Sequence, residues 1–171
     1  MGVFARLFGS EREEPELREL WLRVVAIARD PAWYAERGIA DTMAGRFDAL
    51  SMVLALVLLR MEGNLALRAP SSRLTEQFIA DMDGQLRQEG VGDLVVGKRI
   101  AKLMSALAGR IGACREGLSA SDPAVLEGAV RRNVTLLEHA DPAPVAAALR
   151  ALADQLQALP DEALLAGQIG Q

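Results

Sequence analysis

The residues best suited to chemistry form a motif that resembles a phosphate-binding loop. Residues 92–98 follow the pattern G-x-x-x-x-G-K, whose backbone N–H groups hold phosphates in nucleotide-binding proteins. A Ser or Thr should come next to bind Mg²⁺, but Arg99 stands there. Such a loop should also follow a buried strand, whereas the preceding residues are typical of a helix end. Both departures argue against nucleotide hydrolysis, so Lys98 is expected to be a solvated charge.

Two neighbouring carboxylates are a second candidate for chemistry. Asp81 and Asp83 resemble part of a calcium loop, but its first and last ligand positions hold Ile79 and Gly90. On a helix the two carboxylates point about 200° apart, so they cannot share one substrate atom. The sequence therefore predicts neither a calcium site nor a catalytic pair here.

Composition excludes further classes of protein. The single cysteine, Cys114, cannot form an internal disulfide or a multi-thiolate metal site, which favours a reducing compartment. The single histidine, His139, is expected at a helix end. An isoelectric point near 5.1 argues against DNA binding. No catalytic residue, metal or cofactor is predicted, and we do not expect an enzyme.

The elements that must position any functional residues are helices. Ala and Leu supply 29 and 26 of the 171 residues, whereas β-branched and aromatic residues are scarce. Proline, glycine and capping residues divide the chain into seven predicted helices. These begin near Pro15, Pro31, Thr42, Leu74, Asp93, Pro123 and Pro142. The third, residues 42–62, is apolar on all faces and typical of a helix buried all round.

These elements predict an all-α, single-domain bundle of about seven helices over residues 15–171. A flexible segment is expected at residues 1–14; the alternative is a short amphipathic membrane contact through Phe4, Leu7 and Phe8. The longest apolar run, residues 49–59, is too short to span a bilayer, which takes about 20 residues. We therefore expect a soluble protein.

Charge is unevenly distributed between two successive predicted helices. Residues 76–93 contain five acids and one Arg, whereas residues 94–115 contain five bases and no acid. One interpretation is mutual pairing between antiparallel neighbours. The other is a basic face, with Lys98, Arg99 and Lys102 close together, that docks an acidic client or ribosomal RNA.

Two blocks of the sequence form a distinctive combination. The first contains Trp33-Tyr34, the residues 38–42, and 45–48 followed by an apolar helix ending at Arg60. The second runs from Phe78 through Asp81-Met-Asp83 and Leu86-Arg87 to Lys98, and Gly109-Arg110 forms its end. Over about residues 21–115 the chain resembles the ubiquinol-cytochrome c chaperone family.

The resemblance implies an α-helical, non-enzymatic assembly factor for the cytochrome bc1 complex, of the bacterial branch. Its implied partner is nascent or newly inserted cytochrome b. Mitochondrial relatives also act with a small partner protein and contact the ribosome. A cytoplasmic location follows, at most peripheral at the inner membrane. The residues alone leave open a helical interaction module with a different client.

A chaperone for a membrane protein must shield apolar helices, which requires an apolar groove. The helices at residues 50–61 and 74–86 contain methionines, whose side chains adapt to irregular partners. We expect the groove to combine them with aromatic and charged residues. The candidate client-binding residues are Trp33, Tyr34, Arg46, Phe47, Asp48, Phe78, Asp81, Asp83 and Lys98. Complete burial of Trp33, Tyr34, Phe47 and the side chains of these two helices would contradict this prediction.

Overall fold

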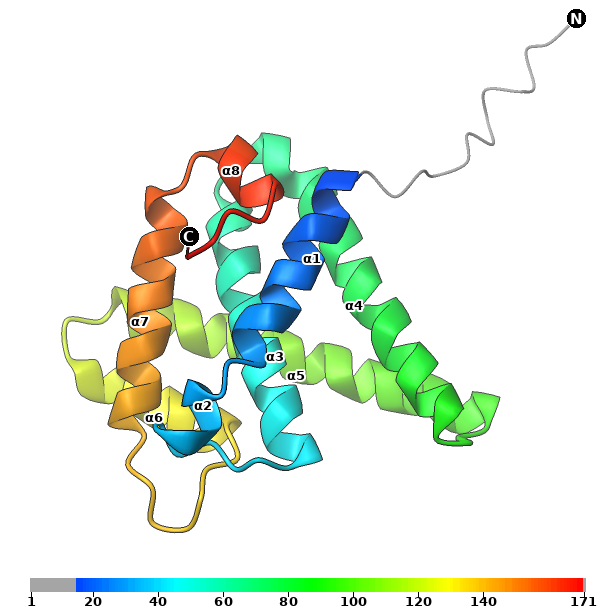
Figure 1. Cartoon of the computed structure of the whole chain (residues 1–171), viewed down its shortest axis with the longest axis horizontal. Coiled ribbons are helices and arrows are strands. Elements are labelled where there is room, and N and C mark those ends of the chain that lie inside the picture. Colours follow the sequence, from blue (N-terminus) through cyan, green and yellow to red (C-terminus); the bar gives the residue numbers. More distant parts are fainter. Residues whose placement is uncertain (1–14, 171) are drawn as a thin grey trace, which may run out of the picture.

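The computed structural model describes residues 15–170, which form eight α-helices and one 3-10 helix (Figure 1). They are α1 (Pro15–Ala28), α2 (Ala32–Ala35), α3 (Met43–Glu62), η2 (Leu65–Leu67), α4 (Arg68–Gln88), α5 (Asp93–Ser119), α6 (Pro123–Asn133), α7 (Ala143–Ala158) and α8 (Asp161–Leu165). The described residues contain no strand beyond one isolated bridge between Ile39 and Leu136. The predicted all-α bundle is confirmed, and the seven predicted helices are present. The predictions for residues 1–14 lie outside the described residues.

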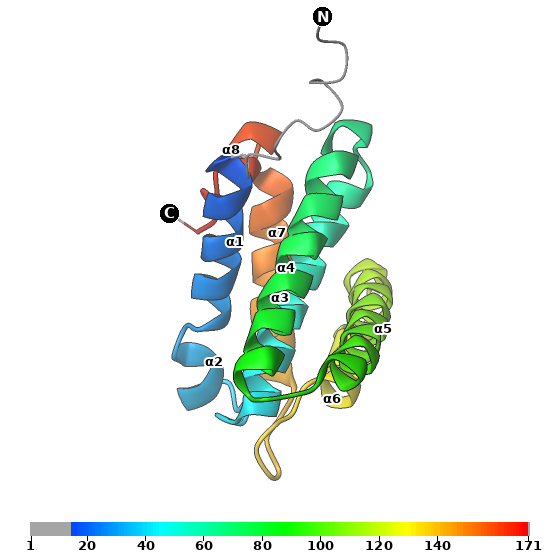
Figure 2. The same ribbon diagram turned by 90° about the vertical axis from the view of Figure 1, so that its right-hand side faces the viewer.

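Helix α3 forms the centre of the bundle. Every side chain from Ser51 to Leu58 is buried, and the helix contacts α1, α4, α5 and α7 (Figure 2). The buried Ser51 hydroxyl donates to the Phe47 carbonyl at 2.8 Å, which satisfies its hydrogen-bonding group within the helix. Helix α3, which is apolar on all faces, therefore packs against other helices on all sides, as its sequence predicts.

Capping residues fix several helix starts. Thr42 Oγ1 accepts from the Gly45 N–H at 3.1 Å, and Asp122 Oδ1 accepts from the Ala124 N–H at 2.9 Å. One boundary differs from that expected. Helix α4 starts at Arg68, before the predicted Leu74, and Pro70 is accommodated in its first turn, where the N–H that proline lacks would have no helical partner.

Helix α8 and the residues after it pack against α1. Leu164 and Ile169 are fully buried, and α8 contacts α1. Arg23 Nε of α1 donates to the Ile169 carbonyl at 2.7 Å. The segment after α7 therefore completes the packing around α1.

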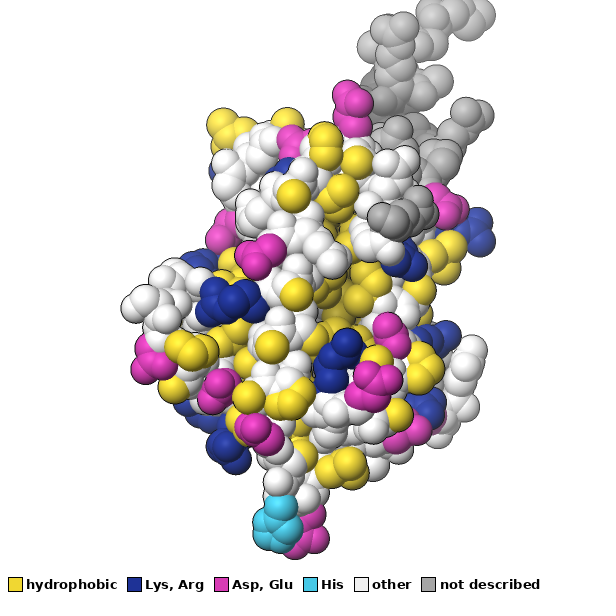
Figure 3. Space-filling view, turned by 60° about the vertical axis from the view of Figure 1, so that its left-hand side comes forward, with side chains coloured by type: hydrophobic (Ala, Val, Ile, Leu, Met, Phe, Trp, Pro, Cys, Tyr) yellow, Lys and Arg dark blue, Asp and Glu magenta, His cyan; other side chains and the backbone are white. Residues whose placement is uncertain are grey.

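Two further regions project from the bundle. The loop between α6 and α7 extends from its lower end (Figure 3) and contains His139, which has a φ of 63°. We expected His139 at a helix end, which is wrong because α6 already ends at Asn133. The other projection is the turn that joins α4 to α5 (Figure 1). Within residues 15–170 no helix combines the length and apolarity needed to cross a membrane.

Candidate functional site

A groove of about 770 Å³ lies among four elements of the fold: the second half of α1, α2, the first turns of α3 and the second half of α4. Its larger apolar side chains are Trp21, Val25, Tyr34, Met43, Phe47, Leu50 and Met82. Its polar side chains are Arg29, Asp41, Arg46, Asp81 and Gln85. The groove thus combines aromatic and methionine surfaces with charges of both signs.

Two of the aromatic rings that line the groove pack against a third ring in the core. Phe78 is 1% exposed and lies between two rings that line the groove. Its centroid is 6.3 Å from that of Trp21, with the rings edge to face at 66°. The Phe47 ring lies 6.2 Å away at an angle of 35°. Such aromatic contacts hold Trp21 and Phe47 in fixed positions.

Asp81 connects the two long walls of the groove. Its Oδ2 accepts from the Trp21 indole Nε1 at 2.7 Å, which joins α4 to α1. Its Oδ1 accepts from Gln77 Nε2 at 3.0 Å, one turn earlier on α4. Both carboxylate oxygens are therefore occupied, and Asp81 orients Trp21.

The part of the groove formed by α2 and the start of α3 contains the phenol of Tyr34 and an exposed ion pair. The Tyr34 hydroxyl donates to the Ala28 carbonyl at 2.8 Å. Burial raises the Tyr34 pKa above 10.0, although the positive charge of Arg46 acts in the opposite direction. Arg46 Nε lies 2.7 Å from Asp41 Oδ1, and this hydrogen bond lowers the Asp41 pKa. The side chains on this wall are suited to binding, with a neutral phenol and a paired carboxylate.

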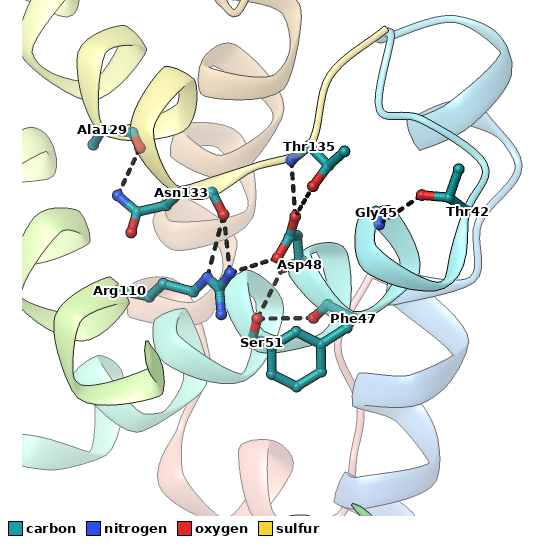
Figure 4. Close-up of polar contacts among 9 residues, drawn as sticks. All are labelled: Thr42, Gly45, Phe47, Asp48, Ser51, Arg110, Ala129, Asn133 and Thr135. Carbon is teal, nitrogen blue, oxygen red and sulfur yellow. Dashed lines mark hydrogen bonds and ion pairs between the residues drawn. The ribbon is translucent and has the colours of Figure 1, made fainter. Parts of the chain in front are cut away.

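Asp48 lies outside the groove, in a buried ion pair (Figure 4). Its Oδ1 accepts from an Arg110 guanidinium nitrogen at 2.5 Å, and its Oδ2 accepts from the Thr135 N–H and hydroxyl at 2.8 and 2.7 Å. Arg110 also donates to the Asn133 carbonyl at 3.0 Å and lies 5.2 Å from the Phe47 ring centroid. This network joins α3, α5 and the residues after α6.

Burial dominates the electrostatics of this pair. It lowers the Arg110 pKa, and the nearby Asp48 charge only partly opposes that shift. The third guanidinium nitrogen of Arg110 is buried without a hydrogen-bond partner. We assign Asp48 and Arg110 a structural role, because neither is accessible to a client.

The groove contains four of the nine candidate residues: Tyr34, Arg46, Phe47 and Asp81. Trp33, Asp48 and Phe78 are buried in the protein interior. Asp83 and Lys98 lie toward the turn between α4 and α5, where Asp83 pairs with Arg87 at 2.8 Å.

The mutual pairing expected between the acids of α4 and the bases of α5 is wrong. Arg87 of α4 instead pairs with both Asp83 and Asp93. Within residues 15–170 no ion pair connects Lys98 to α4. The first turns of α5 therefore keep their positive charge.

Sequence reasoning missed the α1 wall of the groove. Trp21, Val25 and Ala28 recur at helical spacing, a pattern that indicates a buried face without distinguishing core from groove. The Trp21–Asp81 hydrogen bond joins residues 60 positions apart, so no local signal could reveal it. Across the described residues no group of His, Cys, Asp and Glu is arranged to hold a metal.

Comparisons with known proteins place this geometry in context. The family model described as ubiquinol-cytochrome C chaperone matches residues 35–170. Among solved structures, the chain is similar to the crystal structure of the Cbp3 homolog from Brucella abortus. The two are 36% identical, with a TM-score of 0.81 over 96% of this chain and 94% of that one. No curated protein sequence matches the chain.

Proposed function

Because the chain belongs to the ubiquinol-cytochrome c chaperone family, we propose that it is a non-enzymatic assembly factor for the cytochrome bc1 complex. We further propose that the groove between α1, α2, α3 and α4 binds newly made cytochrome b. The observation that carries this proposal is the groove itself, lined by aromatic side chains and two methionines. Such a surface suits an apolar helix that has not yet reached its partners.

The chemistry of the groove supports a binding role. Met43 and Met82 have unbranched side chains, which can adjust to the ridges of different apolar helices. The carboxylate of Asp81 is held by two donors, and that of Asp41 is paired with Arg46. Both acids are thus engaged by other side chains of the protein, which supports a structural role for them in the groove.

We also propose where the protein acts and which other partners it has. We place the protein in the cytoplasm, with contact to the inner membrane that is peripheral at most. We also propose that the protein acts with a small partner protein and contacts the ribosome, because the family resemblance implies both. The alternative is a helical interaction module that uses the same groove for a different client.

A groove variant and a matched control test the client proposal. Met43 lines the groove and is 71% exposed, whereas Leu65 is 78% exposed and lies outside it. We expect Met43→Glu to reduce the cytochrome b captured with the protein about tenfold, equivalent to about 1.4 kcal/mol. Leu65→Glu should capture as much as the wild type. Capture is measured by crosslinking in cells labelled during synthesis, alongside the level of assembled bc1 complex.

Two outcomes would contradict the proposal. Equal capture by both variants would exclude the groove as the binding site. Capture of unrelated membrane proteins as efficiently as cytochrome b would favour the alternative module. Because both substituted side chains are exposed, unchanged melting temperatures should accompany either result.

A further inference from the structure

The turn between α4 and α5 projects aliphatic side chains into solvent. Leu94 and Val95, in the first turn of α5, are 89% and 48% exposed. Figures 1 and 2 show α4 and α5 meeting at this turn, away from α1, α7 and α8. An apolar side chain as exposed as Leu94 contributes nothing to the core, so its position requires another explanation.

Three bases follow these aliphatic residues along α5. Lys98, Arg99 and Lys102 are all exposed, and within residues 15–170 none of them forms an ion pair. Of the nearby acids, Asp83 and Asp93 are paired with Arg87, and Glu89, which caps the end of α4, is exposed. The later bases of α5 are also engaged. Arg110 pairs with Asp48, and Arg115 pairs with Glu62 at 2.7 Å.

These five residues form one face of α5, which we call the elbow surface: Leu94, Val95, Lys98, Arg99 and Lys102. At about 100° per residue they fall within an arc of roughly 140°, along about 12 Å of helix. The aliphatic side chains lie at the projecting end, and the bases lie one and two turns behind. This order matches the layers of an anionic bilayer, in which phosphates overlie the acyl chains.

We propose that the elbow surface docks the protein onto an anionic lipid bilayer. Leu94 and Val95 insert at the boundary of the acyl chains, and the three bases bind lipid phosphates. Charge complementarity supports this occupant, because the elbow surface carries three unpaired bases and no acid. RNA offers phosphates but no apolar layer for Leu94, so a bilayer accounts for both halves of the surface.

Helix α4 leads from the groove to the turn that precedes the elbow surface. Gln85 lines the groove and lies in the last turn of α4, directly before the chain turns towards α5. Docking through the elbow surface therefore brings the groove close to the bilayer. The lipid contact itself does not depend on what the groove binds, so the two proposals can fail separately.

Sedimentation of the full-length protein with lipid vesicles tests the proposal. We expect binding to vesicles of phosphatidylcholine and phosphatidylglycerol, and at least tenfold weaker binding to phosphatidylcholine alone. The double variant Lys98→Gln/Lys102→Gln should weaken binding to the anionic vesicles at least tenfold. The control, Arg131→Gln/Arg132→Gln, makes the same change in net charge at two exposed bases of α6 and should bind as the wild type does.

A third variant tests the apolar half of the elbow surface. Leu94→Ser should weaken binding severalfold without lowering the melting temperature, because Leu94 makes little contact with the core. The proposal is overturned if the wild type ignores anionic vesicles, or if both double variants lose binding equally. Binding that survives Lys98→Gln/Lys102→Gln also overturns it, since another segment would then carry the contact. Capture of RNA or an acidic protein in place of vesicles would assign the surface to that partner.

Discussion

At the scale of single residues, Asp48 connects three separate parts of the chain. One of its oxygens binds Arg110 of α5, and the other binds Thr135 after α6. The pair is buried, so removing one partner leaves the other with a desolvated charge and unmade hydrogen bonds. The same guanidinium lies against Phe47, one of the rings of the groove. The buried pair thus supports the groove without being part of it.

The first prediction concerns this pair. We expect Asp48→Ala to lower the free energy of unfolding by about 3–5 kcal/mol, because it leaves the Arg110 charge buried and uncompensated. Urea unfolding followed by circular dichroism measures the change. Asp41→Ala serves as the control, since it breaks an exposed pair with Arg46 and should leave stability nearly unchanged. A small effect in both variants would contradict the structural role of Asp48.

At the scale of elements, two helical glycines have opposite surroundings. A Cβ on Gly45 would lie 1.9 Å from the Ala40 carbonyl oxygen, so the first turn of α3 approaches the preceding chain too closely for any side chain. A Cβ on Gly97 of α5 would meet nothing within 4 Å. Gly45 is therefore required by packing, whereas Gly97 only weakens its helix.

Replacement by alanine should change the free energy of unfolding in opposite directions at the two glycines. We expect Gly45→Ala to lower the free energy of unfolding by at least about 1–3 kcal/mol, through overpacking. Gly97→Ala should raise it by about 0.5–1 kcal/mol, because alanine favours an exposed helix interior. Both values follow from urea unfolding curves. Changes of the same sign in the two variants would contradict the packing described here.

Most of the fold could be predicted because its helices carry local signals. Pro31, Thr42 and Asp122 mark helix starts, and the apolar faces repeat at helical spacing. Helix α8 was missed because five residues are too short to display that period. Tertiary packing defines this helix instead, through the fully buried Leu164.

The candidate site was less predictable, because burial decides the role of each charge. Asp48 and Asp81 are both aspartates on helices with an apolar face, and the sequence does not distinguish them. One pairs with Arg110 in the interior, and the other holds Trp21 at the groove. Both outcomes depend on contacts between residues about 60 positions apart in the chain.

At the scale of the whole molecule, ionisation of the Cys114 thiol makes the free energy of unfolding depend on pH. Cys114 is fully buried in α5, and its desolvation raises the thiol pKa from 9.0 to about 11, against the opposing charge of Arg110. Between these two values an unfolded chain releases the thiol proton while the folded chain keeps it. Stability from this group is therefore complete below pH 9 and is lost as the pH rises towards 11.

Comparison with Cys114→Ala isolates this effect. We expect the free energy of unfolding of the wild type to fall more steeply between pH 9 and about 11 than that of the variant. Urea unfolding at a series of pH values measures both slopes. Parallel slopes would indicate that the thiol is not desolvated, and rapid labelling of Cys114 under native conditions would support the same conclusion.

The packing of α8 and Ile169 against α1 also has a consequence for the order of events during synthesis. Helix α1 leaves the ribosome before α8, and the carbonyl that Arg23 binds belongs to a residue made 146 positions later. One long wall of the groove thus gains its last contacts only after translation has passed Ile169. A growing chain therefore cannot offer a finished groove until Ile169 has been made and Arg23 can bind its carbonyl.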